Sequence, residues 1–479
     1  MSGDGRAPVA IIGAGVAGLS CAASIANAVE RDGPVVELID QGSRGRGGRA
    51  SSSRPTTHDP PLVFDHGCQF FTAESEAFRE TCAALERAGH IARWGGRFGT
   101  LDASTGVFRA KSENDAKAGD DFFRLLAAKD VYVGVPTMRG LCDGLRELIP
   151  ENAAVDSPQC AVTRLERARD EDADENATPW VVSGVGGRAL DELESGSRER
   201  ALGAFRAVVA TDVMLAKTGT PGSCAFEGVA GVSDEEATKK QEEVSGASAR
   251  AAATWRVMRD APAESLFSLM VAFGSDGPAA EEEDASVPFD AAVVTGCGTI
   301  QLLVRDSAKP GPARSCTRNR WTAVSTAAFA ARVVADAPLS VDGAYNPQTA
   351  AYLERATPAM VEATSDLLSR AAANERKRMS ASASNESNEK GISDCSDRSD
   401  RCRDAATLYR VPPRHARSQR WGHAFPKRGW GGAAFAWDPA LGFGACGDFA
   451  AGPGVEAAWT SGAQAGAAVA RTMRGEVGG

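Results

Sequence analysis

What the chain lacks excludes several classes of protein. No apolar run reaches the ~20 residues that a helix needs to cross a bilayer. Positive charge is not in excess, because 53 Lys and Arg residues stand against 63 Asp and Glu residues and the formal net charge is -10. A surface that binds phosphate backbones must be basic. We therefore expect neither a membrane nor a nucleic acid as a partner.

Other familiar patterns are missing as well. The 11 cysteines include no C-x-x-C pair, so their spacing predicts neither a disulfide framework nor a metal site. Scattered thiols fit a reducing compartment, and the first apolar strand candidate begins so close to Met1 that a leader peptide is not expected before it. The predicted location is the cytoplasm. No G-x-S-x-G motif is present, which argues against a hydrolase with a Ser/His/Asp triad.

What is present at the start of the chain is a β-turn-α-β pattern. Residues 8–12 form a short apolar run, residues 19–29 are rich in alanine and suit a helix, and residues 35–40 form a second apolar run that ends in an acid. Such a unit is typical of a parallel sheet. The order of these segments predicts that the chain begins with an α/β domain.

The turn of this unit carries a G-x-G-x-x-G motif formed by Gly13, Gly15 and Gly18. Glycines here permit a tight turn and a close approach of a pyrophosphate to the N-terminus of the following helix. Asp40 lies at the end of the second strand, where a carboxylate that binds a ribose is expected. The alternative is a turn that uses glycine for its own packing. The context of strand, turn, helix and acid favours a dinucleotide site.

A second glycine-rich segment follows closely. Gly47, Gly48 and Arg49 offer backbone N–H groups and a guanidinium group to a diphosphate, although a flexible basic loop would have the same composition. Gln69 could present its amide to a flavin ring, or could be a buried glutamine that satisfies backbone groups. The segment favours FAD over NAD as the cofactor.

The C-terminal region contains a matching segment. A short apolar strand ends at Gly447 and Asp448, and Gly454 and Val455 open a helix of small residues. An aspartate at a strand end can accept hydrogen bonds from ribityl hydroxyls, and a helix N-terminus supplies a positive end. Small residues also allow a neighbouring backbone to approach closely. A helix packed on a sheet is therefore the alternative interpretation.

The middle of the chain is less informative. We expect a helix over residues 138–149 behind Thr137 as N-cap, and strands over residues 160–165, 180–183, 204–210 and 407–411. Three polar stretches, residues 171–176, 281–284 and 380–400, have too few apolar side chains to offset the entropy of ordering. We interpret them as solvated loops.

Taken together, these motifs resemble the flavin amine oxidase superfamily, and most closely its renalase-like branch. The resemblance rests on the N-terminal and C-terminal motifs above and on two further stretches. These are residues 241–244 leading into residues 252–257, and Gln419 to Pro426. It implies an α/β fold with a Rossmann-like FAD-binding domain of the p-hydroxybenzoate-hydroxylase type and an inserted α+β substrate domain. The FAD-binding domain would comprise residues 1–75, 137–215 and 431–479, and the substrate domain residues 76–136 and 216–430.

The resemblance also implies a chemistry. FAD would bind non-covalently between the two domains, with further contacts from Val162 and Thr211, and a small reduced substrate would transfer a hydride to it, with oxygen as the acceptor that reoxidises it. Isomeric dihydronicotinamides are the substrates of renalase-like enzymes. An amine oxidase acting on C–N bonds and a flavin-binding protein without turnover are the alternatives.

Catalytic groups are harder to find in the sequence. His423 and Gln69 are the candidates, since imidazole can serve as a donor or a base. A histidine packed at a strand edge is, however, the more common situation and the alternative interpretation of His423. Trp255, Trp421 and Trp459 would either line the flavin pocket or belong to the core, because large aromatic side chains bury much area whatever the function.

Overall fold

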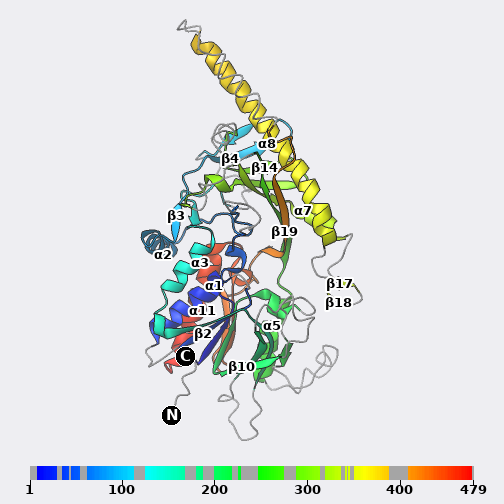
Figure 1. The fold of residues 1–479 in the computed structure, drawn as a ribbon. Helices are drawn as coiled ribbons and strands as arrows, with labels where there is room; N and C mark the ends of the chain where they lie inside the picture. Colours follow the sequence, from blue (N-terminus) through cyan, green and yellow to red (C-terminus); the bar gives the residue numbers. More distant parts are fainter. Residues whose placement is uncertain are drawn as a thin grey trace.

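The computed structural model describes the chain in segments and has a mixed α/β fold (Figure 1). The described residues are 8–29, 35–42, 45–53, 62–112, 124–167, 180–186, 199–217, 225–227, 246–274, 287–312, 319–335, 340–341, 344–345, 350–387 and 408–476. Figure 1 shows a lower half built on the first strands and a last helix, and an upper half built on a second sheet with a long helix along its outer side. In the described part, no helix is long and apolar enough to cross a membrane.

The lower half is organised by a six-stranded sheet with a parallel core. Its strand order is β20-β21-β11-β1-β2-β7, and only β20 runs antiparallel to its neighbour. All four residues of β1 are buried, as expected for a strand covered on both faces. The strands are β1 (Val9–Ile12), β2 (Val36–Asp40), β7 (Ala154–Pro158), β11 (Ala207–Ala210), β20 (Phe435–Asp438) and β21 (Phe443–Cys446).

Helices formed by the two ends of the described chain pack together beside this sheet. Helix α1 (Val16–Ala28) and helix α11 (Val455–Met473) lie in close contact. A Cβ atom at Gly462 would overlap the carbonyl oxygen of Ala17, and one at Gly466 would overlap that of Cys21. The small residues of α11 therefore serve close helix packing, which is one of the two interpretations that the sequence left open.

A four-stranded sheet is attached to the lower half. Its order is β10-β9-β8-β12, from the strands β8 (Cys160–Arg167), β9 (Trp180–Gly186), β10 (Arg200–Phe205) and β12 (Ala225–Glu227). Helix α5 (Gly246–Arg259) contributes Trp255 and Met258 to the same apolar cluster as Val208 and Phe443 of the six-stranded sheet. The sequence suggested a domain boundary after residue 215. The chain after this residue still belongs to the lower half, however, because β12 pairs with β8 and α5 packs on the lower half.

The upper half is a seven-stranded mixed sheet of order β19-β13-β16-β15-β14-β4-β5. Its face opposite the lower half is covered by α7 (Ala327–Ala335) and α8 (Ala350–Ser387), which enclose a second core with Phe267, Trp321 and Tyr352. The strands are β4 (Phe98–Asp102), β5 (Phe108–Ala110), β13 (Ala263–Ala272), β14 (Ala291–Thr295), β15 (Ile300–Arg305), β16 (Arg320–Ser325) and β19 (His415–Pro426).

The remaining elements are short or join the two halves. Helix α2 packs on α11 through Phe78 and Trp459, whose ring centroids are 5.2 Å apart. The remaining elements are α2 (Glu76–Arg87), α3 (Arg139–Glu147), α10 (Asp448–Ala451), β3 (Ile91–Arg93), β6 (Tyr132–Gly134), β17 (Ser340–Val341), β18 (Ala344–Tyr345), and the 3-10 turns η1 (Gly48–Ala50), η3 (Glu151–Ala153), η5 (Val213–Ala216) and η6 (Asp306–Ala308).

Four local expectations need correction. Thr137 does not cap α3, because the carboxylate of Asp65 accepts the N–H of Met138 at 3.0 Å instead. The segment 204–210 is two strands, since the chain passes from β10 to β11 at Arg206. Helix α8 continues to Ser387, eight residues past Met379, and so enters the stretch 380–400 that we interpreted as a loop. Residues 408–411 form a turn rather than a strand. The stretches 171–176, 241–244 and 281–284 lie outside the described residues.

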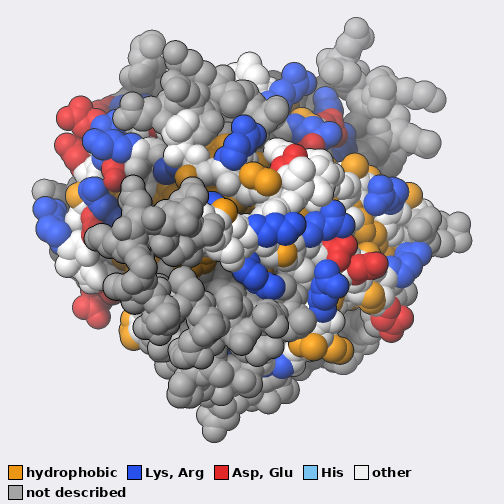
Figure 2. Space-filling model, turned by 90° about the horizontal axis from the view of Figure 1, so that it is seen from above, with side chains coloured by type: hydrophobic (Ala, Val, Ile, Leu, Met, Phe, Trp, Pro, Cys, Tyr) orange, Lys and Arg blue, Asp and Glu red, His pale blue; other side chains and the backbone are white. Residues whose placement is uncertain are grey.

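Figure 2 shows the top of the molecule, where Lys and Arg side chains lie across the middle of the face. This face belongs to the upper half, away from the glycine-rich turn.

Candidate functional site

The glycine-rich turn after β1 has one position that faces open space. Cβ atoms at Gly13 and Gly18 would overlap Thr211 Oγ1 and the Gly13 carbonyl oxygen, so these two glycines are required by the turn itself. A Cβ at Gly15 would meet only the Gly47 carbonyl oxygen, at 4.0 Å. Gly15 is the N-cap of α1, so the backbone N–H groups of the first helical turn point beside this open space. That arrangement suits an anionic ligand.

Thr211 and Asp40 hold the turn in shape. Thr211 follows β11, and its hydroxyl donates to the carbonyl oxygens of Ile12 at 2.8 Å and Gly13 at 3.3 Å. The Asp40 carboxylate, at the end of β2, accepts the N–H groups of Ala14 and Gly42, both at 2.8 Å. Each carboxylate oxygen has two acceptor sites, so Asp40 keeps capacity for a ribose hydroxyl.

The second glycine-rich segment lies directly against the first. Gly47 donates its N–H to the carbonyl oxygen of Ala14 at 3.2 Å, and both Gly47 and Gly48 have positive φ angles, 131° and 53°. These angles favour glycine. They turn the chain so that Arg49 is directed toward the C-terminal motif.

Arg49 and Asp448 form a bidentate ion pair. The two guanidinium nitrogens donate to the two carboxylate oxygens at 2.6 Å each, and Arg49 also donates to the Ala424 carbonyl oxygen at 3.3 Å. Burial lowers the pKa of Arg49, but the charge and hydrogen bonds of Asp448 outweigh it, so that the pKa is raised. The Arg49 side chain is nevertheless 42% exposed, whereas Asp448 is 8% exposed. Part of the Arg49 side chain therefore remains exposed, although both terminal guanidinium nitrogens bind Asp448.

The other predicted cofactor residues occupy two places. Val162 is buried in β8, in one cluster with Ile39 of β2. Gly454 is the N-cap of α11 with φ 122°, a Cβ there would meet nothing within 4 Å, and Val455 is the first residue of this helix. The N-terminus of α11, like that of α1, is thus open at its glycine.

Gln69 is engaged by the protein. Its amide nitrogen donates to the carbonyl oxygens of Asp65 and Gly67, and its amide oxygen accepts from Lys309 Nζ at 3.4 Å. The side chain is 5% exposed. This geometry is that of a glutamine that satisfies backbone groups, and a catalytic role for Gln69 stays a prediction.

His423 lies in β19, next to the Arg49–Asp448 pair. Burial lowers its pKa to about 4, and the positive charges of Lys217 and Arg49 act in the same direction. The imidazole is therefore neutral at pH 7, which suits a hydrogen-bond acceptor or donor rather than a cation. The structure brings His423 together with Arg49 and Asp448, and its role in catalysis stays a prediction.

The three tryptophans fall into two groups. Trp255 and Trp459 pack in apolar clusters, against Phe443 and Phe78 respectively. Trp421 lies closer to the site, because its indole N–H donates to the His66 carbonyl oxygen at 2.9 Å and to Ser268 Oγ at 3.1 Å. Trp421 thus contacts residues 65–68, and Cys68 of this segment in turn donates its N–H to the carbonyl oxygen of Arg49.

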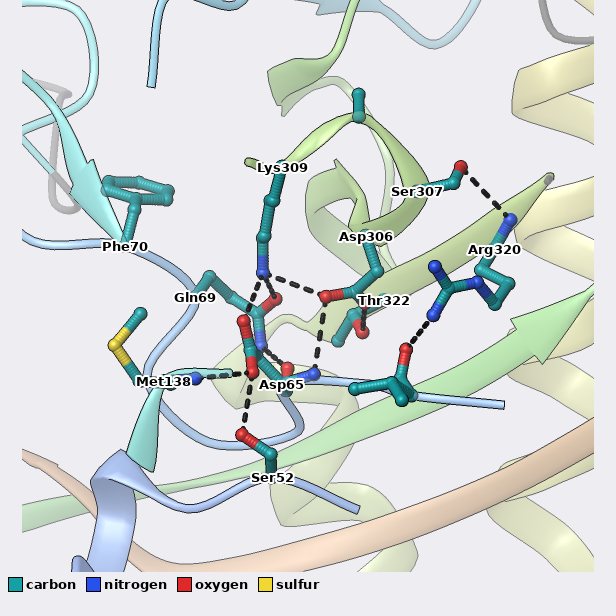
Figure 3. A network of polar contacts seen from close by, with 12 residues as sticks. Ser52, Asp65, Gln69, Phe70, Met138, Asp306, Ser307, Lys309, Arg320 and Thr322 are labelled. Atoms are coloured by element: carbon teal, nitrogen blue, oxygen red, sulfur yellow. Dashed lines mark hydrogen bonds and ion pairs between the residues drawn. The ribbon is translucent and has the colours of Figure 1, made fainter. Parts of the chain in front are cut away.

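A buried ionic network near this segment was not predicted from the sequence. The side chains of Lys309, Asp65 and Asp306 are fully buried, and Lys309 forms an ion pair with each of the two acids (Figure 3). The signal was the pair Asp306 and Lys309, three residues apart directly after an apolar strand. It was not recognised because a charged pair at a strand end is usually solvated. Among the described residues, no group of His, Cys, Asp and Glu side chains has the geometry of a metal site.

Comparisons with known proteins concern the fold. Residues 11–85 match the family model described as an NAD(P)-binding Rossmann-like domain. The solved structure of cyclohexylamine oxidase from Brevibacterium oxydans IH-35A is similar over 98% of this chain and 99% of that chain, with a TM-score of 0.52 and 13% sequence identity. An oxidoreductase from Methanosarcina mazei is matched over 95% of this chain and 99% of that one, with a TM-score of 0.48 and 11% identity. The chain thus has a mixed α/β fold with a Rossmann-like NAD(P)-binding domain.

Proposed function

We propose that this protein is an oxidoreductase that binds FAD non-covalently and oxidises a small substrate. The observation that carries the proposal is the meeting of three motifs: open space at Gly15, the partly exposed side chain of Arg49, and Asp448 from the other end of the chain. A nucleotide that only spanned the Rossmann turn would need the first motif alone. The contact with the C-terminal motif supports a longer cofactor that reaches the boundary between the two halves.

The residues divide the binding task between them. The N–H groups at the start of α1 and the Arg49 guanidinium group would hold the pyrophosphate, and Asp40 would hold the adenosine ribose. Asp448 would accept ribityl hydroxyls, and the N-terminus of α11 would lie near the ring system. FAD, when bound, supplies the hydride acceptor. The protein supplies orientation and exclusion of water.

The substrate is proposed to be a reduced nicotinamide isomer, as the renalase-like motifs imply. Such a donor needs no strong protein base, because aromatisation of its ring drives the hydride transfer. A neutral, half-buried His423 fits this requirement, since it would orient a substrate without carrying a charge. Oxygen is the proposed acceptor that completes the cycle.

An amine is the second candidate substrate. Its support is the similarity of the fold to cyclohexylamine oxidase over nearly the whole chain. A neutral imidazole would also suit an amine substrate, which must react in its uncharged form. The geometry of His423 therefore does not separate the two candidates, and an experiment must.

The test is a spectrum followed by an anaerobic titration. The purified protein should be yellow, and acid should release free FAD. Dihydronicotinamide isomers should bleach the flavin absorbance rapidly, while cyclic primary amines should not; the reverse result would select the amine oxidase. If neither class bleaches the flavin, a flavin-binding protein without turnover becomes the better description. A colourless protein that takes up NAD but not FAD would overturn the proposal.

A further inference from the structure

The buried network around Lys309 joins the two halves of the molecule. Lys309 Nζ donates to Asp306 Oδ1 at 2.8 Å and to Asp65 Oδ2 at 3.0 Å. Lys309 and Asp306 follow β15 in the upper sheet, whereas Asp65 lies on the chain segment that leaves the nucleotide-binding unit. All three side chains are 0% exposed. A single ammonium group thus links a carboxylate of each half.

Both carboxylates also accept hydrogen bonds from neutral donors. Asp65 Oδ1 accepts from Ser52 Oγ at 2.7 Å and from the Met138 N–H at 3.0 Å. Asp306 accepts from the Thr322 hydroxyl and, at 3.2 Å, from the Asp65 N–H. Figure 3 shows these donors converging on the two acids from opposite sides. The arrangement satisfies buried charges that would otherwise be strongly destabilising.

The segment fixed by Lys309 is the one that supports Arg49. Within four residues of Asp65, the Cys68 N–H donates to the Arg49 carbonyl oxygen at 2.7 Å. A Cβ at Gly67 would overlap the same carbonyl oxygen and would approach the Trp421 ring to 3.1 Å. The segment and the backbone of Arg49 are therefore in direct, tight contact. Displacement of the segment must move Arg49.

We propose that Lys309 is a positioning residue that clamps residues 65–70 between the two halves and thereby sets the Arg49 guanidinium group against Asp448. The effect of Lys309 on Arg49 rests on the proposed FAD site, because it makes Lys309 a determinant of cofactor affinity although the cofactor would not touch it. The clamping of residues 65–70 concerns the protein alone.

Cys68 provides an internal reporter for the clamp. Burial and, to a smaller extent, the charge of Asp65 raise the pKa of its thiol to about 12, and the charge of Lys309 opposes this rise. Removal of the Lys309 charge without movement would therefore make the thiolate rarer and alkylation slower. Release of the segment would expose the thiol and make alkylation faster. The two effects have opposite signs.

The experiment measures iodoacetamide labelling of Cys68 by peptide mass spectrometry in cofactor-free Lys309→Met protein, and FAD affinity in the same variant. We expect labelling to become about tenfold faster and FAD binding about tenfold weaker, each equivalent to ~1.4 kcal/mol. Lys111→Met is the matched control, because Lys111 is a partly exposed lysine of the same half that donates to the Ala128 carbonyl oxygen. It should change neither quantity.

Thr322→Val and Ser52→Ala keep every charge and remove one hydrogen bond to each acid, so they carry the test if Lys309→Met does not fold. Both should raise the labelling rate, by less than Lys309→Met. Slower or unchanged labelling in all three variants would overturn the clamp. Faster labelling with unchanged FAD affinity would overturn the coupling to Arg49. Faster labelling in a protein whose wild type binds no FAD would leave the clamp standing and refute the proposed function instead.

Discussion

Arg49 and Asp448 lie 399 positions apart in the chain, yet their side chains meet in a bidentate ion pair with both N–O distances at 2.6 Å. The pair joins the two ends of the chain, because Arg49 comes from the turn that hydrogen-bonds to the glycine-rich turn before α1, and Asp448 begins α10 after β21. Paired guanidinium and carboxylate groups also pre-organise each other for a ligand that carries both phosphates and hydroxyls. The first prediction follows from this dual use.

Arg49→Met should lower the affinity for FAD more than it lowers the stability of the cofactor-free protein. The variant loses a charged donor that we assign to the pyrophosphate, and hydrogen bonds to charged groups contribute about 1.5–3 kcal/mol each. It also leaves Asp448 without its partner, so Asp448→Asn serves as the companion variant that removes the negative charge but keeps the shape. Equilibrium titration with FAD and thermal unfolding of the cofactor-free protein measure the two effects. Equal FAD affinity in wild type and Arg49→Met would show that the pair has only a structural role.

Gly15→Ala and Gly18→Ala should separate cofactor binding from folding. A Cβ at position 15 meets nothing closer than 4.0 Å, and the residue has the extended backbone angles φ -84° and ψ -173°, so the cofactor-free protein should tolerate alanine. A Cβ at position 18 overlaps the Gly13 carbonyl oxygen, and overpacking of this kind typically costs about 1–3 kcal/mol. We expect Gly15→Ala to lose FAD affinity at an unchanged Tm.

The Gly18→Ala variant should instead have a lower Tm already in the absence of cofactor. If Gly15→Ala retains full flavin occupancy, measured as the ratio of flavin to protein absorbance, the open space beside Gly15 is not where the pyrophosphate binds.

The sequence predicted the parts of the fold that depend on local patterns. The β1–α1–β2 unit was found because apolar runs, glycines and Asp40 fall at fixed spacings, and the family match to residues 11–85 confirms a Rossmann-like domain. The mixed α/β fold class is likewise confirmed. The binding roles of Val162, Thr211 and the glycines stay predictions.

The parts that the sequence missed depend on contacts between distant segments. Asp65 as the group that caps α3 could not be found, because Met138 is 73 positions away. The same holds for the pairing of β12 with β8, which joins residues 225–227 to the lower half although their composition suits either half. Lys309 was missed because its two acids come from different halves, and only tertiary packing makes the trio a buried cluster.

His423 should make the stability of the protein depend on pH in the acid range. Its pKa in the folded state is about 4, below the ordinary value of 6.5, because burial disfavours the charged imidazole. The unfolded chain therefore binds a proton first as the pH falls. The contribution of His423 to stability is fully present above pH 6.5, decreases between pH 6.5 and 4, and levels off below 4.

Urea unfolding at pH values from 7 to 4 measures this dependence. His423→Gln should show a shallower decrease across the interval than wild type, since glutamine does not titrate. His90, which pairs with Glu147 at the surface, provides His90→Gln as the control with a solvent-exposed partner. Identical pH profiles for wild type and His423→Gln would mean that the imidazole is not buried in solution.

Gly462→Ala should destabilise the protein by pushing α11 away from α1. The added methyl group would overlap the Ala17 carbonyl oxygen, which belongs to helix backbone and cannot move aside alone. Overpacking of a helix contact typically costs about 1–3 kcal/mol, whereas alanine at an exposed helical position changes stability by less than about 0.5 kcal/mol. Gln464→Ala, two residues along the exposed side of the same helix, is therefore the matched control. Chemical denaturation of both variants without cofactor measures the difference. A Gly462→Ala variant as stable as Gln464→Ala would show that α1 and α11 lie farther apart than described, and the open N-termini of these two helices would then not face a common ligand.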